Sequence, residues 1–594
     1  MRLHLLAGAA LLCAHPAFAQ DPLAPITDQP APAEKPQFTL PPPPQIIIAP
    51  PQSPVVSPTP APPLIPIPRD WLGVFAAIRS GNWASADAGI ALLPPSVLSP
   101  VAWAELYTAR GSPTVDLARL EALLAEAPDL PQAEQLARMA LARGATTSPL
   151  IVPRKPLMFL GSAPARYRAR PVQGEPAADE LRAALDPLVK ADDPANAELL
   201  LTQAAPLLSL EARAEAGQRV AWAYYSDGRD ADARRVADTW RVGATGDWAT
   251  QAAWISGLAS WRQSDCEAAS RAFREVAAIA RERELNAGAY YWAARSEQMC
   301  RRPQSVAPLL KAAARSNESF YGLLARETLG MDTRLPAGPP GAGADVENLP
   351  NVRRAVELAR IDERPLAEEM LRHQARICRP SEHHGLIEVA RRLDLAGAQF
   401  WLAHNGQPGA ISFPQDAYPM PHWTPLTGWR VDPALAFAHI IQESTFRTDA
   451  VSAAGAVGLM QVRPGTAGDM ARAQGLAFST STLTDPSYNL EFGQSFIEAM
   501  RRSPATGGQL PRMMAAYNAG PLPVGRWAAI PGQGDPLLWI ESIPYWETRY
   551  YVPAVFRNLW VYQGLAKAET PTLAAIAQHR WPAFPTSHTN LSVR

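Results

Sequence analysis

The sequence has few of the residues that hold metal ions or form covalent cross-links. Its 594 residues include 4 cysteines and 10 histidines, with no Cys-x-x-Cys pair and no histidine cluster at the spacing of a zinc site. The adjacent residues His383 and His384 are the only such pair, and we expect them to be exposed and non-ligating. The sequence therefore predicts no bound metal and no cofactor.

The chain also lacks an excess of either charge. A formal net charge of -1 and a pI near 6.8 provide no general attraction to nucleic acid or acidic lipid. Beyond the N-terminus no apolar run is long enough to cross a bilayer. These absences argue against a nucleic-acid partner and a transmembrane segment, and they favour a neutral or zwitterionic partner.

The first residues are typical of a secretory signal peptide. A basic start is followed by an apolar stretch and by Ala17, Phe18 and Ala19, so residues 1–19 are predicted to be cleaved off. Lipid attachment at Cys13 is the alternative, but Leu12 is too bulky for the usual pattern before a lipidated cysteine. We expect an exported protein, located in the periplasm.

Proline dominates the next segment, residues 20–69. Residues 22–68 hold 18 of the 61 prolines, with few charges and almost no apolar periodicity. Such a stretch lacks amide donors and cannot bury a core, so it predicts an extended, partly polyproline linker. A proline-directed binding partner is an alternative that no motif supports.

From residue 70 onward, apolar positions recur at three and four residues, as in amphipathic helices. Similar segments lie at 221–225, 257–261 and 291–295, a spacing typical of stacked helical hairpins. We predict an α-solenoid over residues 70–335. Its Tyr and Trp residues are interpreted as packing between hairpins rather than as a ligand-binding stripe.

Two cysteines lie at matching positions of these hairpins. Cys266 and Cys300 are 34 residues apart, which favours a disulfide between neighbouring repeats and leaves Cys378 free. Three unpaired thiols are the alternative.

Gly- and Pro-rich breaks divide the rest of the chain. Residues 336–410 are predicted as a helical linker domain, residues 411–570 as a further domain and residues 571–594 as a tail.

Four short motifs follow one another within residues 411–570. They read ESTF at 443–446, GLMQ at 458–461, AYNAG at 516–520 and ESIP at 541–544. Together they resemble the catalytic domain of the lytic transglycosylases, which cut the glycan strands of peptidoglycan. Residues 319–325 similarly resemble the segment that closes the helical scaffold in the soluble members.

This resemblance implies a mainly α protein, with an N-terminal α-solenoid followed by a C-terminal lysozyme-like α domain. It also implies that Glu443 is the catalytic acid and then the base, without a second catalytic carboxylate. The residues themselves support an acid role, since Asp432 can cap a helix whose apolar residues surround Glu443 near its end. Burial there is expected to raise the pKa of Glu443 and keep it protonated.

The resemblance assigns roles to several other residues. Tyr517 would orient the carboxyl of Glu443, and Met460 would form an apolar wall of the glycan groove. The remaining expected substrate-binding residues are Ser452, Gln461, Asn518 and Glu541.

The implied reaction cleaves the β-1,4 bond between N-acetylmuramic acid and N-acetylglucosamine and leaves a 1,6-anhydromuramoyl end. A lysozyme-like hydrolase and a non-catalytic helical scaffold that binds envelope components are the two alternatives. The predicted partner is the peptidoglycan strand, and other envelope partners stay unassigned.

Overall fold

The computed structural model describes residues 66–336, 338–339, 343–532 and 534–585. Among them the protein is almost entirely helical, and the described strands are a single antiparallel pair, β1 (Met158–Phe159) and β2 (Asn405–Gly406). This confirms the mainly α fold class. The predicted signal peptide, and the Pro-rich segment as far as residue 65, lie outside the described residues.

The first of two compact units contains the described residues up to Val115, together with Ser452–Ala454. Its helices are α1 (Trp71–Arg79), α2 (Trp83–Leu92) and α3 (Ser99–Thr108). Asp70 caps α1 by accepting a hydrogen bond from the amide of Gly73 at 2.7 Å. The three helices pack on one another.

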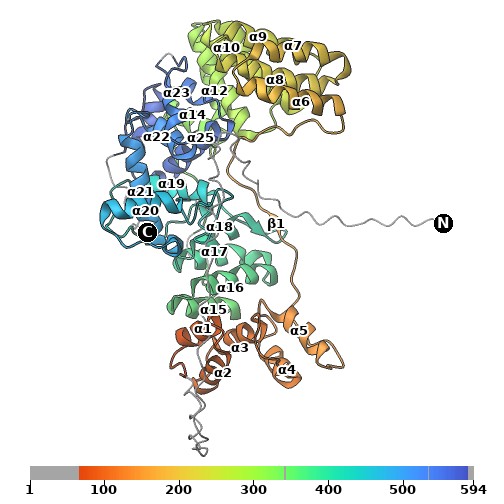
Figure 1. Ribbon diagram of the computed structural model, residues 1–594, viewed down its shortest axis with the longest axis vertical. Helices are drawn as coiled ribbons and strands as arrows, with labels where there is room; N and C mark the ends of the chain where they lie inside the picture. The colour runs from red at the N-terminus through yellow and green to blue at the C-terminus, as the bar shows by residue number, and fades with distance from the viewer. Residues whose placement is uncertain (1–65, 337, 340–342, 533, 586–594) are drawn as a thin grey trace, which may run out of the picture. The chain divides into compact units, whose positions relative to one another are not determined.

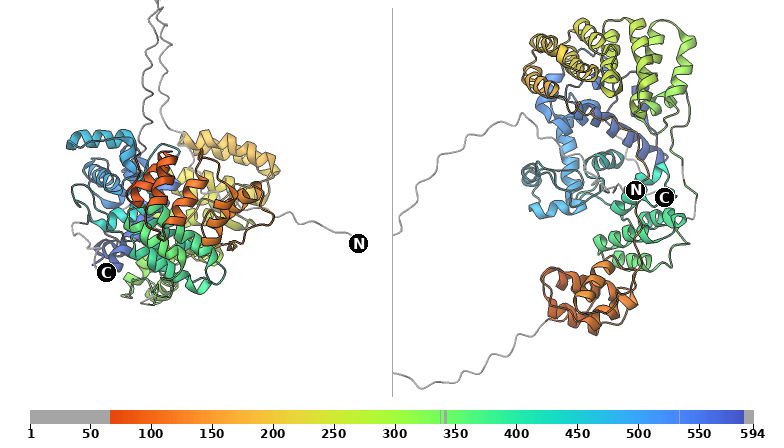
Figure 2. Two further views of the ribbon diagram at one scale, coloured as in Figure 1. Left: turned by 90° about the horizontal axis from the view of Figure 1, so that it is seen from below. Right: turned by 90° about the vertical axis from the view of Figure 1, so that its right-hand side faces the viewer.

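The second unit holds all further helices (Figure 1). Its first part consists of α4 (Leu117–Glu126), α5 (Ala133–Ala142), α6 (Pro176–Lys190), α7 (Pro194–Ala204), the 3₁₀ turn η1 (Ala205–Leu207), α8 (Leu210–Ser226), α9 (Asp230–Trp240), α10 (Gly246–Arg262), α11 (Cys266–Ile279), α12 (Arg283–Met299), α13 (Pro303–Ala313) and α14 (Phe320–Thr328). Consecutive helices from α8 to α13 pack as hairpins, side by side in yellow to green in Figure 2.

The three similar sequence segments lie in α8, α10 and α12, the first helices of successive hairpins, which confirms the repeat. Their aromatic residues form the core between hairpins, as predicted: Tyr225 and Trp292 are fully buried, and Trp292 packs edge-on against Trp261 with ring centroids 5.3 Å apart. The disulfide between Cys266 and Cys300 is present and joins the start of α11 to the end of α12. Cys378 is free and buried.

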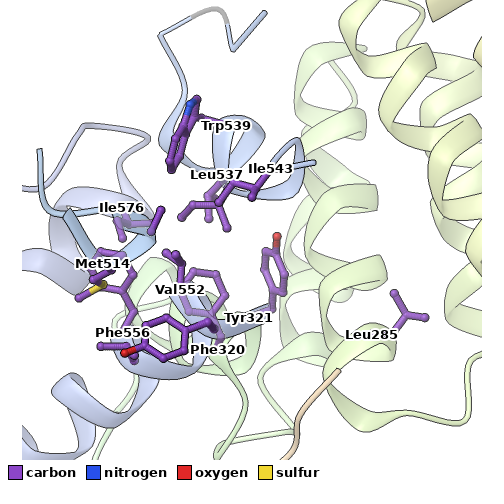
Figure 3. Close-up of a cluster of buried hydrophobic side chains, with 14 of the residues drawn as sticks. Leu285, Phe320, Tyr321, Met514, Leu537, Trp539, Ile543, Val552, Phe556 and Ile576 are labelled. Atoms are coloured by element: carbon purple, nitrogen blue, oxygen red, sulfur yellow. The ribbon is translucent and has the colours of Figure 1, made fainter. Parts of the chain in front are cut away.

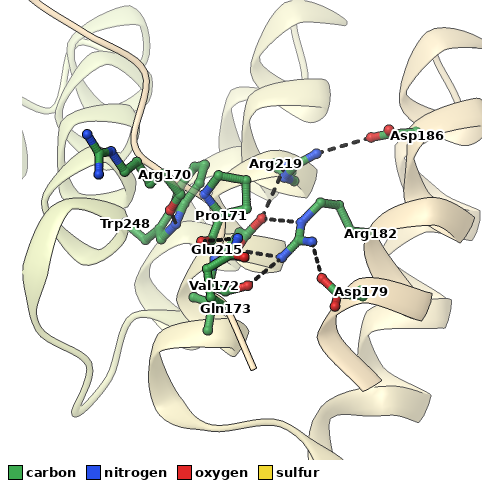
Figure 4. A network of polar contacts seen from close by, with 10 residues as sticks. All are labelled: Arg170, Pro171, Val172, Gln173, Asp179, Arg182, Asp186, Glu215, Arg219 and Trp248. Carbon is green, nitrogen blue, oxygen red and sulfur yellow. Dashed lines mark hydrogen bonds and ion pairs between the residues drawn. The ribbon is translucent and has the colours of Figure 1, made fainter. Parts of the chain in front are cut away.

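One stretch departs from the predicted run of hairpins. Between α5 and α6 the chain is extended, and we call its residues 150–173 the strap. Its prolines remove amide donors, so it has no helix and forms hydrogen bonds to other elements instead. Two hydrogen bonds join the strap to the hairpins (Figure 4). The backbone amide of Val172 in the strap donates to Glu215 of α8 at 2.7 Å, and the indole of Trp248 in α10 donates to the strap carbonyl of Arg170 at 2.8 Å.

After α14 come α15 (Pro350–Arg360), α16 (Arg364–Ile377), η2 (Pro380–Glu382), α17 (His383–Arg392) and α18 (Ala396–His404). The motif-bearing part follows with η3 (Pro414–Ala417), α19 (Pro433–Glu443), α20 (Pro464–Gln474), η4 (Thr480–Thr484), α21 (Pro486–Arg502), α22 (Leu510–Ala519), α23 (Pro521–Trp527), α24 (Pro536–Glu541), α25 (Trp546–Leu565) and α26 (Pro571–Ala577). The described helices lack the combination of length and apolar character that a membrane span needs.

The hairpin region and the motif-bearing region share one hydrophobic core. Phe320 and Tyr321 of α14 lie in this core with Phe556 of α25 (Figure 3). The ring of Phe320 stacks on that of Trp560 of α25, with the ring centroids 5.2 Å apart. The segment predicted as a tail begins with α26, whose Leu573 and Ile576 are fully buried and which packs on α14. Helix α25, which follows the last motif, is therefore fixed from both sides.

Candidate active site

Helix α19 carries Glu443 at its C-terminal end. Asp432 caps the helix as predicted, accepting from the amide of Ala434 at 3.0 Å, and Gln563 of α25 donates to the same carboxylate. Burial raises the pKa of Glu443 to about 7, partly offset by a hydrogen bond from Tyr551 and reinforced by the charge of Glu547. Glu443 is still partly exposed, so a ligand can reach it. Because its pKa is raised, a substantial fraction of the carboxyl is protonated near neutral pH.

The backbone turns sharply directly after Glu443. Thr445 and Phe446 have φ values of 53° and 64°, a left-handed conformation that is unfavourable for residues other than glycine. Phe446 is buried and packs against Phe437 at 6.1 Å, which holds the turn in place. Strain of this kind is common at functional sites, where the surrounding packing maintains it.

Tyr551 of α25 holds the carboxyl of Glu443. Its hydroxyl donates to Oε1 at 2.6 Å, and Nδ1 of His439 lies 2.7 Å from the same hydroxyl oxygen. The hydroxyl of Tyr517 instead donates to the carbonyl of Met460 at 2.7 Å. The expectation that Tyr517 orients the carboxyl is therefore corrected: Tyr551 makes the hydrogen bond. Burial, and after it the charge of Glu443, raises the pKa of Tyr517.

Asn489 of α21 holds the glycine-rich loop that precedes α20. Gly458 has a φ of 80°, and a Cβ there would lie 2.2 Å from Nδ2 of Asn489, so only glycine fits. The side-chain nitrogen of Asn489 donates to the carbonyls of Val457 and Leu483. Its side-chain oxygen accepts from the backbone amide of Met460 at 2.7 Å. These bonds fix the loop in front of α21.

Met460 does not form the expected groove wall. Its side chain is fully buried and lies against Gly493, where a Cβ would approach the sulfur to 2.1 Å. The apolar side chain fills the space between the loop and α21 rather than facing solvent. Gln461 is partly exposed with a φ of 48°, and its amide nitrogen donates to the carbonyls of Ala450 and Gly458. Ser452 is partly exposed in the same loop.

Asn518 lies in the last turn of α22, next to the first turn of α25. Its side-chain oxygen accepts from the hydroxyl of Thr548 at 2.6 Å, and its nitrogen lies 3.5 Å from a carboxylate oxygen of Glu547. Gly520, with a φ of 82°, then ends the helix as predicted. Asn518 therefore links two elements of the site and positions Glu547, which is partly exposed beside Glu443.

Glu541 was expected to be a groove carboxylate, and its burial contradicts this. The side chain is 1% exposed and pairs with Arg166 of the strap at 2.7 Å. It also accepts from the hydroxyl of Tyr321 at 2.7 Å and from the indole of Trp254 at 3.3 Å. Both oxygens are occupied by groups from the strap and the hairpins, so Glu541 anchors the motif-bearing region instead of contacting a ligand.

The adjacent histidines are buried rather than exposed. Nε2 of His383 lies 2.9 Å from the carbonyl of Leu402. His384, Glu388 and Asp416 each have a potential ligand atom within 4.8 Å of the others. Asp416 already accepts from the amide of Phe413 at 2.7 Å, and Arg391 pairs with Glu388, so hydrogen bonds account for this arrangement.

The structure adds three residues to the site that were not predicted: His439, Tyr551 and Glu547. Glu547 and Tyr551 follow the last motif and stand four residues apart, a spacing that places them side by side on one helical face. His439 stands four residues before Glu443 and offered the same signal. Nothing in the sequence indicated that Arg166 would reach Glu541, 375 residues away.

The site thus combines a half-buried carboxyl, a tyrosine that binds one of its oxygens and a glycine-shaped loop on a helical domain. Residues 425–540 match the model of the transglycosylase SLT domain family. This part of the chain is therefore similar to the transglycosylase SLT domain.

Known proteins resemble the chain at two levels. The soluble lytic murein transglycosylase of Escherichia coli K12 is 32% identical over 158 residues, which are 26% of this chain and 24% of that protein. The match thus spans about a quarter of the relative's length. The crystal structure of the 70-kDa soluble lytic transglycosylase SLT70 from Escherichia coli is 17% identical, with a TM-score of 0.53 over 86% of this chain and 98% of that chain.

An inactive mutant of lytic transglycosylase Slt from Pseudomonas aeruginosa is 20% identical, with a TM-score of 0.53 over 84% of this chain and 86% of that chain. At these identities the two solved structures establish a shared fold over most of the chain.

Proposed function

We propose that this protein is a lytic transglycosylase that cleaves the MurNAc-GlcNAc β-1,4 bond of peptidoglycan. The observation that carries the proposal is Glu443, a half-buried carboxyl with a pKa raised to about 7 in an SLT domain. A carboxyl of this kind can donate a proton near neutral pH and afterwards accept one. The lytic murein transglycosylases among its relatives support the same reaction.

In the proposed mechanism, protonated Glu443 gives its proton to the glycosidic oxygen as the bond to the muramoyl C1 breaks. The resulting carboxylate then takes the proton of the muramoyl 6-hydroxyl, whose oxygen attacks C1. The product is a 1,6-anhydro ring, and Glu443 is protonated again. Tyr551 keeps donating to Oε1, which leaves Oε2 for both proton transfers.

Substrate contacts are proposed for partly exposed polar residues in and near the motifs. Gln461, Ser452 and Asn518 offer amide and hydroxyl groups to sugar hydroxyls or acetamido groups. Glu547 is added to this set because it is partly exposed and acts electrostatically on Glu443. Met460 and Glu541 support the site from within the core.

A hydrolase on the same fold is the second candidate. Glu547 motivates it, because a second carboxylate beside the acid is the arrangement that most glycosidases use. We favour the transglycosylase because the relatives are lytic murein transglycosylases. A binding scaffold is disfavoured because binding alone needs no carboxyl with a raised pKa.

We further propose that the protein acts in the periplasm after cleavage of residues 1–19, with peptidoglycan strands as its partner. The helical regions 70–335 and 336–410 would carry the catalytic domain, which we place at 411–570.

The test is the mass of the products. Purified sacculi are digested with the enzyme and with the Glu443→Gln variant, and the muropeptides are weighed. Muramoyl ends lighter by one water, formed by the wild type alone, are the expected result. Predominantly reducing ends would indicate the hydrolase, and no release would indicate a binding scaffold.

Bulgecin A provides an independent check. It forms a complex with the 70-kDa soluble lytic transglycosylase, whose structure has a TM-score of 0.54 with this chain. We expect bulgecin A to bind this protein and inhibit release of anhydro products, as measured by calorimetry and by the sacculus assay.

A further inference from the structure

A buried histidine lies behind the tyrosine that holds the catalytic carboxyl. His439 stands on α19 one helical turn before Glu443, and it is 0% exposed. Its Nδ1 is 2.7 Å from the hydroxyl oxygen of Tyr551, and that oxygen is 2.6 Å from Oε1 of Glu443. The three side chains therefore form one hydrogen-bonded chain that begins and ends on the same helix.

The direction of this chain follows from counting hydrogens. A phenol has a single O–H, and that of Tyr551 is donated to Glu443. The contact between His439 and Tyr551 must then be a donation from Nδ1–H to the phenol oxygen. Burial lowers the pKa of His439 to about 3, so the ring is neutral and carries one proton, which the contact places on Nδ1.

The rest of the ring agrees with this tautomer. Nε2 has no hydrogen-bond partner among the described residues, so the ring makes one polar contact, to Tyr551. The ring of Tyr517 lies 4.4 Å from the imidazole and holds it by packing. A rigid donor on one side of Tyr551 prevents its hydroxyl from turning away from Glu443.

We propose that His439 is a positioning residue that orients the Tyr551 hydroxyl onto Oε1 of Glu443 and so reserves Oε2 for proton exchange with the glycan. The inference rests on the proposed function, since it assumes that Glu443 is the acid and base. His439 does not touch substrate. Its donation polarises the Tyr551 hydroxyl, which strengthens the bond to the carboxylate formed midway through the reaction.

Several titratable groups face Glu443, and the test must distinguish their effects on its pKa. Tyr551 and Glu547 of α25 and Tyr517 of α22 interact with its charge, and His439 reaches it only through Tyr551. The bond from Tyr551 lowers the pKa of Glu443. Weakening that bond therefore raises this pKa and moves the high-pH limb of the activity profile upward.

The experiment measures kcat and KM against pH on solubilised glycan strands for His439→Leu, His439→Asn, Tyr551→Phe and the double variant His439→Leu/Tyr551→Phe. We expect His439→Leu to lower kcat by up to roughly tenfold, the upper value of one hydrogen bond between neutral groups, and to shift the high-pH limb upward. KM should change little. His439→Asn keeps an N–H near the position of Nδ1 and should recover part of the loss.

The double variant is decisive because His439 is proposed to act only through Tyr551. It should match Tyr551→Phe in kcat and in the position of the limb. His383→Gln, at a second buried histidine away from the site, is the matched control and should leave the limb unchanged.

An unshifted limb in folded His439→Leu would overturn the proposal, as would a full additional loss in the double variant. Circular dichroism melts establish folding. If His439→Leu does not fold, His439→Gln decides the outcome, because its amide lies near the position of Nε2 and not of Nδ1, and an unshifted limb in that variant would equally overturn the proposal. If the wild type itself releases no product, the proposed function fails instead, so the two failures are distinguishable.

Discussion

At the scale of single residues, the burial that raises the pKa of Glu443 also costs stability. The folded protein holds its pKa near 7, whereas an unfolded chain has the ordinary value of 4.5. Between these values the folded state binds a proton that the unfolded state has lost, so stability falls as pH rises through this window. Below about 4.5 both states are protonated and the penalty vanishes.

Glu443→Gln should therefore abolish turnover and stabilise the fold in alkaline solution. The amide cannot donate an acidic proton, and it removes a penalty on the order of 3 kcal/mol at pH 8. Urea unfolding at pH 8 and pH 4 measures the second effect, which should be present only at pH 8. Equal stability of wild type and variant at pH 8 would contradict the raised pKa.

Glu547 acts on Glu443 by charge. Its negative charge raises the pKa of Glu443, so Glu547→Gln should lower this pKa and move the high-pH limb of activity to lower pH. The shift is opposite to that expected for Tyr551→Phe. Because a nucleophile would be indispensable, residual formation of anhydro product by Glu547→Gln also excludes a covalent role for Glu547.

At the scale of elements, the strap joins parts of the chain that the helices alone would leave separate. Arg166 pairs with Glu541 and lies over the rings of Trp254 and Tyr550, at 4.8 and 4.9 Å. Tyr550 immediately precedes Tyr551, so this contact steadies the turn of α25 that reaches Glu443. Arg557 of the same helix donates to the strap carbonyl of Pro164 at 2.6 Å.

Arg166→Met should destabilise the protein by about 3 to 5 kcal/mol, because it leaves Glu541 charged, buried and without its cation. The measurement is urea unfolding at neutral pH. Arg334→Met is the matched control, since Arg334 pairs with Asp332 at the surface and should cause no measurable change. A similar midpoint for both variants would show that the strap does not anchor α24.

The disulfide between Cys266 and Cys300 acts on one pair of helices. It closes a loop with a sequence separation of 34, so its removal by Cys266→Ser/Cys300→Ser should cost about 3 to 4 kcal/mol through the unfolded chain. Denaturation with and without reductant measures this cost. Non-reducing peptide mapping that links Cys266 to Cys378 would contradict the pairing.

At the scale of the whole molecule, the hairpins and the motif-bearing region stabilise each other. Phe320 and Tyr321 of α14 contribute to the core around α25, and α26 packs back on α14 from the C-terminal end (Figure 3). Tyr225 of α8 also contacts the hydroxyl of Ser542 at 2.9 Å. The site therefore depends on elements that begin more than two hundred residues earlier in the chain.

A fragment of residues 411–585 should accordingly be unstable or aggregate, because it exposes apolar surface and leaves Glu541 without Arg166 and Tyr321. A chain of residues 66–594 should keep the activity of the full protein on soluble glycan. Thermal melts and glycan assays of both proteins test this. A cooperatively folding, fully active fragment would show that the hairpins are dispensable.

Local pattern alone determined a large part of this protein. Apolar periodicity predicted the helices, the spacing of similar segments predicted the hairpins and the disulfide, and Asp432 with its following proline predicted the helix that carries Glu443. Each of these features depends on residues close together in the chain or on a repeated spacing, so each leaves a readable signal.

Only the tertiary structure decided which polar groups meet. Tyr551 rather than Tyr517 binds Glu443, Met460 turns inward, and Glu541 is buried against Arg166. These outcomes depend on how α19, α22 and α25 pack and on where the strap passes. Burial and hydrogen-bond partners arise from contacts between residues up to several hundred positions apart, and local spacing contains no information about such contacts.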